Sequence, residues 1–145
     1  MHTTSSGATT THPAERILAI LGALACLGIT IPIWLSVAAN QSMWPLPGLY
    51  FIEIVAVSIL SALAVVRGLG RAGLASWVAA GILAAFSILG ALSVGFFYLP
   101  AAIIFGLLAL YSDVRQKRPI LAHLGLGALA ALAQAALMLA LVRLH

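Results

Sequence analysis

Apolar residues occur along this chain in blocks of about 20, the length of a helix that crosses a bilayer, with short polar or basic segments between them. The longest is the 41-residue run from Ala72 to Ser112, which contains no Asp, Glu, Lys or Arg. A single helix of this length would extend about 60 Å, roughly twice the hydrocarbon thickness. The run is therefore predicted to be a hairpin of two spans.

The bend of this hairpin is expected at residues 93–100, where Gly95 loosens the backbone and Pro100 suits the first turn of a new helix. The complete pattern predicts an all-α, polytopic helical membrane protein with five transmembrane helices. The predicted spans are residues 16–39, 49–66, 72–94, 96–112 and 120–144. Residues 1–14 are expected to form a disordered Thr/Ser-rich tail, and residues 15–145 a single helical membrane domain.

The first span has two features of its own. A secretory signal peptide is the alternative, because residues 36–38 form a small-x-small cleavage sequence, but the apolar part is longer than the 7–15 or so residues usual in signal peptides. A retained span is therefore favoured. Pro32 is expected to kink this helix, since its ring clashes with the Gly28 carbonyl, and the Thr30 hydroxyl or a neighbouring helix would relieve the lost hydrogen bond.

Composition and charge set the class and the topology. Charged residues make up 7% of the chain, against about 25% in soluble domains, so there is no solvated surface. The net charge of +4 comes from basic residues at turns, a distribution typical of topology determinants and not of a nucleic-acid interface. These determinants are Arg67, Arg71, Arg115, Lys117 and Arg118.

With five spans, both basic turns lie on one side of the membrane, whereas four spans would separate them. By the positive-inside rule the N-terminus is then cytoplasmic and the C-terminus outside. The Ala-, Leu- and Gly-rich, Lys-poor composition looks like that of small membrane proteins of high-GC bacteria, so the expected location is the bacterial plasma membrane, the cell inner membrane.

Glu53 is the only acidic residue within a predicted span, and intramembrane carboxylates are candidates for function because they are costly. It lies four residues, about 6 Å, inside its span. A proton or cation site, a contact with a partner helix and an interfacial packing role all remain open. Ser58 and Ser61 extend a mildly polar stripe on the same helix.

In the last span His123, Gly127, Ala131 and Gln134 share one helical face, which is expected to meet other helices. His123 is not expected to bind haem, because the other histidines are near the termini and give no second ligand at matching depth. A solvated or packed interfacial histidine is the better interpretation. Small residues every fourth position in residues 72–94 predict a packing helix.

No phosphate-binding, thiol-redox, zinc-protease or hydrolase motif occurs, and the three carboxylates are too scattered for paired acid–base chemistry. No cofactor, metal or nucleic acid is expected. The favoured function is a non-enzymatic accessory or structural subunit that packs against partner or identical helices in the lipid bilayer. The alternative is a small oligomeric transporter or channel component with Glu53 in a polar path. A membrane enzyme on a lipid or quinone substrate is a third hypothesis and would need a partner's catalytic groups.

Overall fold

The computed structural model describes residues 11–40, 46–70, 72–90 and 94–144. All regular structure in these residues is helical, and five helices are long and apolar enough to cross a membrane. This confirms the prediction of an all-α protein with five spans. The helices are α1 (Pro13–Asn40), α2 (Leu46–Val66), α3 (Ala72–Leu89), α4 (Leu99–Arg115) and α5 (Ile120–Leu144), with a short 3₁₀ helix, η1 (Gly95–Tyr98), before α4.

α1 begins at Pro13, three residues before the predicted start, because a cap forms around His12. The Ala14 N–H donates to His12 Nδ1 at 3.3 Å, and the His12 N–H donates to Glu15 Oε2 at 3.0 Å. This reciprocal arrangement is a capping box, with Pro13 in the first helical position, where its missing N–H costs nothing. The predicted tail, residues 1–14, thus overlaps the helix at its last two positions, and residues 1–10 lie outside the described residues.

The hairpin bend differs in detail from the predicted one. α3 ends at Leu89 and not at Val94, since the Gly90 N–H closes the last turn on the Phe86 carbonyl and the Gly95 N–H then bonds the Gly90 carbonyl at 2.9 Å. A Cβ on Gly95 would lie 2.6 Å from Gly90 Cα, so this close return needs glycine. The chain continues as η1, and α4 extends to Arg115, three residues beyond the predicted end.

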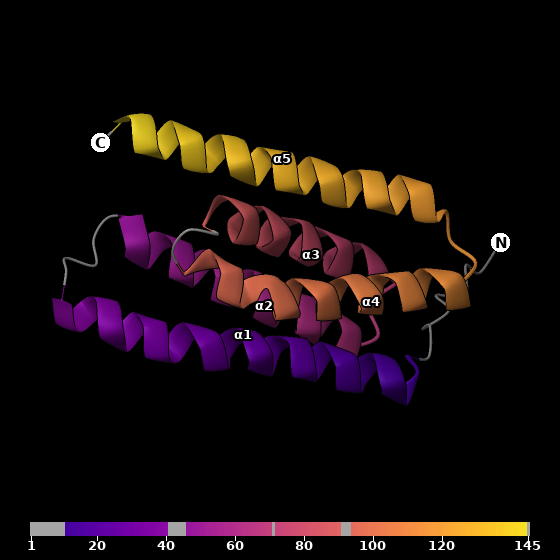
Figure 1. Ribbon diagram of the computed structural model, residues 1–145. Helices are drawn as coiled ribbons and strands as arrows, with labels where there is room; N and C mark the ends of the chain where they lie inside the picture. Colours follow the sequence, from indigo (N-terminus) through magenta and orange to yellow (C-terminus); the bar gives the residue numbers. More distant parts are fainter. Residues whose placement is uncertain (1–10, 41–45, 71, 91–93, 145) are drawn as a thin grey trace, which may run out of the picture.

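α3 is the central helix of the molecule: it contacts α2, α4, α5 and η1. α1, α2, α3 and α4 pack around a common core, and α5 lies along α3 on the side away from α1 (Figure 1). Ser76, Ala80 and Leu83 of α3 are buried in this arrangement, which confirms the predicted packing role of its small residues. α5 is the least buried of the five spans.

α3 and α5 approach each other at glycines. A Cβ on Gly81 would lie 2.1 Å from the Gly127 carbonyl oxygen, and a Cβ on Gly127 would lie 3.0 Å from the Trp77 carbonyl oxygen. In hydrocarbon, helix pairs gain stability chiefly from van der Waals packing, which is best where small side chains let backbones approach. Gly127 belongs to the α5 face predicted to meet other helices, so that prediction is confirmed.

α1 is continuous through Pro32, so the proline does not end the helix. The Thr30 hydroxyl donates to the Cys26 carbonyl at 2.8 Å, and not to the Gly28 carbonyl that Pro32 leaves without a donor. A hydroxyl has one proton, so the Tyr98 hydroxyl must be the donor in its 2.9 Å contact with Thr30 Oγ1. This buried bond joins α1 to η1.

The close α3–α5 contact gives a first prediction. Gly81→Ala is expected to lower the free energy of unfolding by about 1–3 kcal/mol, because the new methyl group must displace the α5 backbone. Gly106→Ala in α4 is the matched control, since nothing lies within 4 Å of its Cβ position and alanine favours a helix. Thermal unfolding in mild detergent measures both, and equal stability of the two variants would contradict the close contact.

Candidate functional site

Most of the charged side chains that the structure describes gather at one end of the bundle, called here the basic end. It comprises the start of α1, the α2–α3 turn and the α4–α5 turn, with Arg16, Arg67, Arg115, Lys117 and Arg118. Four of the five predicted topology determinants therefore lie together, and the fifth, Arg71, is outside the described residues. Arg143 lies near the far end of α5.

At the basic end an ion pair joins α1 to α4. Arg115 Nε lies 3.1 Å from Glu15 Oε1, and Arg115 Nη2 lies 3.1 Å from Glu15 Oε2. Two parallel N–H bonds to one carboxylate are the strongest form of arginine pairing. The Glu15 residue is 1% exposed and also accepts the His12 N–H, so its oxygens are satisfied.

A second carboxylate, Asp113 near the end of α4, joins three helices. Trp77 Nε1 of α3 donates to Asp113 Oδ2 at 2.7 Å, and His123 Nδ1 of α5 lies 2.9 Å from both carboxylate oxygens. Asp113 is completely buried. Gly73 makes room for it, because a Cβ there would lie 3.0 Å from Asp113 Oδ1. An ionised carboxylate only accepts, so Nδ1 carries the His123 proton in this arrangement.

The third carboxylate, Glu53, meets Gln134 across the α2–α5 gap. Gln134 Nε2 donates to Glu53 Oε2 at 3.0 Å, and Gln134 is buried whereas Glu53 is partly exposed. Because α2 begins at Leu46, Glu53 is seven residues, or about 10 Å, inside its helix and deeper than the sequence indicated. Two of the three predicted polar candidates are thus in direct contact.

The contact between Asp113 and His123 was not predicted from the sequence. His123, expected to be a solvated or packed interfacial histidine, contacts Asp113, which was not among the predicted candidates. The available signal was the spacing: Asp113 and His123 flank a short turn between two helices, so their side chains return to the same depth. Gly73 and Trp77, one turn apart in α3, gave no signal by themselves.

The serines of α2 do not continue the polar contact of Glu53. Ser61 donates to Ser76 Oγ of α3 at 3.4 Å, and the buried Ser58 side chain lies near the Cys26 thiol of α1. Within the part of the chain that the structure describes, no group of three His, Cys, Asp or Glu side chains is arranged to hold a metal ion. The polar groups therefore form separate interhelical contacts.

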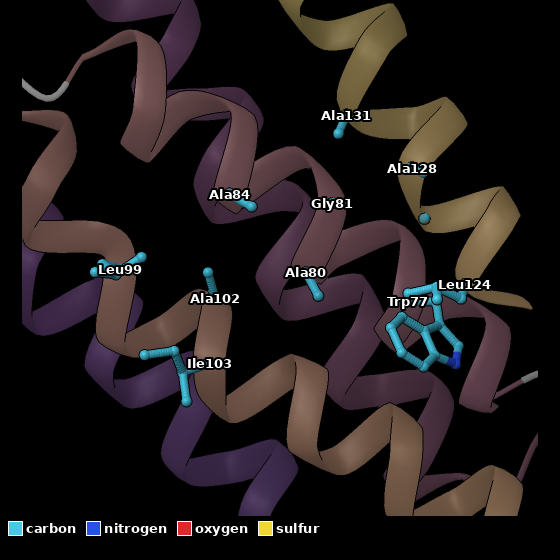
Figure 2. A pocket seen from close by; sticks show the side chains of 11 residues that line it. Trp77, Ala80, Gly81, Ala84, Leu99, Ala102, Ile103, Leu124, Ala128 and Ala131 are labelled. Atoms are coloured by element: carbon cyan, nitrogen blue, oxygen red, sulfur yellow. The ribbon is translucent and has the colours of Figure 1, made fainter. Parts of the chain in front are cut away.

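Between α4 and α5 an apolar groove of about 340 Å³ exposes the small residues of α3 at its floor. Trp77 and Leu124 lie at one end of it and Leu99 toward the other (Figure 2). Ala80, Ala84 and Ala102 are among its lining residues. The groove borders the Asp113 contact, because Trp77 takes part in both.

Comparison with protein-family models, curated proteins and solved structures finds no match for this chain.

The contact between Glu53 and Gln134 gives a second prediction. Glu53→Gln keeps an oxygen that accepts the Gln134 amide, so a packing role predicts a loss of at most about 1 kcal/mol in stability. Glu53→Leu removes the acceptor and leaves the buried Gln134 amide unpaired, with an expected loss of about 1–3 kcal/mol. Thermal unfolding measures both variants. Equal losses would contradict a role for this hydrogen bond.

Proposed function

We propose that this protein is a non-enzymatic accessory subunit of a membrane complex, located in a bacterial plasma membrane. The observation that carries the proposal is that each of the three acidic side chains bonds a donor on another helix, which supports a structural use for all of them. The role of the chain then lies in what it binds, and the peripheral helix α5 is the element through which it binds.

α5 carries a second small-residue face, distinct from the face that packs on α3. It consists of exposed residues spaced three or four apart, Ala122, Gly125, Ala133, Ala136 and Ala140, with Leu129 at its centre. The outward side of α1, by contrast, carries large residues such as Ile17, Leu21 and Leu24. Large side chains suit contact with lipid, and small ones suit close approach of another helix, so a partner's transmembrane helix is the expected occupant of this α5 face.

A transport or channel component is the second candidate, and Glu53 favours it. Its carboxylate is partly exposed, seven residues inside α2, and Oε1 has no donor among the described residues. A partly satisfied carboxylate at this depth is able to take up a proton or a cation. Glu53→Gln would then abolish flux across reconstituted vesicles while leaving assembly intact.

The third prediction tests the α5 face by photo-crosslinking in native membranes. Cys26 is the only cysteine and is buried, so Cys26→Ala gives a background for single cysteines. Leu129→Cys on α5 and Leu24→Cys on α1 are matched in exposure, 64% and 58%, and lie at similar depth. After labelling with a benzophenone maleimide and irradiation, Leu129→Cys is expected to give one defined adduct with a different polypeptide, and Leu24→Cys only lipid adducts.

A variant that fills the face is the control for specificity. Ala136→Leu places a bulky side chain about two turns from Leu129 on the same exposed face and should remove the adduct without affecting the fold. An adduct of equal yield from both cysteine positions, or one that persists in Ala136→Leu, would contradict α5 as the partner-binding helix. Failure of both positions to capture a polypeptide would contradict the accessory-subunit proposal itself.

A further inference from the structure

The turn between α4 and α5 presents positive charge that no residue described in the structure neutralises. Lys117 is exposed and Arg118 half-buried, and neither side chain makes an ion pair or hydrogen bond with any residue that the structure describes. Arg115, just before them, is already paired with Glu15, and Asp113 is held by Trp77 and His123. Two cationic side chains at this turn are therefore available to an external anion.

The backbone of the turn after α4 has the same conformation as the turn after α2, so the residues at corresponding positions can be compared. α4 ends in a Schellman motif, with the Arg118 N–H bonded to the Asp113 carbonyl at 3.0 Å and Lys117 in the left-handed region at φ 51°. α2 ends in the same motif with Gly68 at the corresponding position, at φ 64°. Lysine is less favourable than glycine in this conformation. The chain thus carries a lysine at a cost in stability, which indicates a use for its charge.

The same turn lies at one end of the groove between α4 and α5. Trp77, which closes that end, donates to the Asp113 carboxylate, and the Asp113 carbonyl accepts the Arg118 N–H. Leu124, which lies beside Trp77 (Figure 2), directly follows His123, the other partner of Asp113. The apolar groove therefore ends beside Asp113, whose backbone carbonyl holds the turn that carries Lys117 and Arg118.

We propose that this groove and turn bind an anionic phospholipid of the leaflet at the basic end. One acyl chain lies between α4 and α5, and Lys117 and Arg118 bind the phosphate of the headgroup. A free phosphate would make no use of the groove, and a zwitterionic lipid has no net charge for two cations to attract. A partner helix fits less well, because α4 and α5 converge at the turn that joins them.

This site is independent of the proposed partner-binding face. The groove is lined on α5 by Leu124, Gly127, Ala128 and Ala131, whereas the partner-binding face consists of Ala122, Gly125, Ala133, Ala136 and Ala140. Loss of lipid binding would leave the crosslinking result unchanged, and loss of the crosslink would leave lipid binding unchanged.

The fourth prediction concerns lipid retention by the delipidated protein in detergent, measured by native mass spectrometry. Phosphatidylglycerol and phosphatidylcholine with identical acyl chains are titrated separately, and the wild-type protein is expected to prefer phosphatidylglycerol. Each Lys or Arg near an anionic headgroup contributes about fivefold in affinity. Lys117→Gly should therefore weaken phosphatidylglycerol binding about fivefold, and Lys117→Gly with Arg118→Gln about 25-fold, to the level of phosphatidylcholine.

The variants separate lipid binding from folding. Glycine suits the left-handed position, so Lys117→Gly should unfold at the same temperature as the wild-type protein or a higher one. Arg143→Gln, at the opposite end of α5, should leave the preference unchanged. Ala128→Leu fills the groove from an exposed position and should reduce retention of both lipids.

Three results would overturn the proposal. The first is equal retention of the two lipids by the wild-type protein, and the second is a preference for phosphatidylglycerol that survives in the double variant. The third is undiminished binding of both lipids to Ala128→Leu, which would place the acyl chain elsewhere.

Discussion

A carboxylate in or beside the hydrocarbon of a membrane must find a hydrogen-bond donor, and here each donor comes from another helix. Glu15 ties α1 to α4, Asp113 ties α4 to α3 and α5, and Glu53 ties α2 to α5. Removing one partner of a buried ionic contact typically costs about 3–5 kcal/mol, whereas lipid offers little hydrophobic drive for helices to associate. These three side chains therefore join α4 to α1, α3 and α5, and α2 to α5, while the small residues of α3 let its neighbours pack closely.

The position of α5 follows from the same contacts. Along its length α5 is held by His123 on Asp113, by the close approach of Gly127 to Gly81, and by Gln134 on Glu53. All three residues lie on one narrow face, so the rest of the helix has no neighbour among the described residues apart from a few contacts with α4 near the turn. The exposed small residues and the groove beside α4 are the consequences, and we propose that these two surfaces bind partners of different chemistry.

The five spans could be predicted from the sequence, because the bilayer alone sets the length of an apolar block and excludes charged residues from it. Helical periodicity also predicted the α5 face, and Gly127 and Gln134 on that face are buried. The helix ends at Pro13 and Leu89 could not be predicted, because they depend on a histidine cap and on a Gly90–Gly95 contact. The partners of Glu53 and Asp113 could not be predicted either. Packing across the bundle decides which helices are neighbours, and the residue pattern within one helix carries no information about it.

We propose that this chain acts by binding another membrane protein. This proposal is tested by the native mass of the protein extracted from its own membrane in mild detergent, with every co-purifying polypeptide identified. We expect a stable complex of defined stoichiometry that contains a different membrane protein. A homo-oligomer with no other polypeptide bound would contradict it and would favour the transport function centred on Glu53.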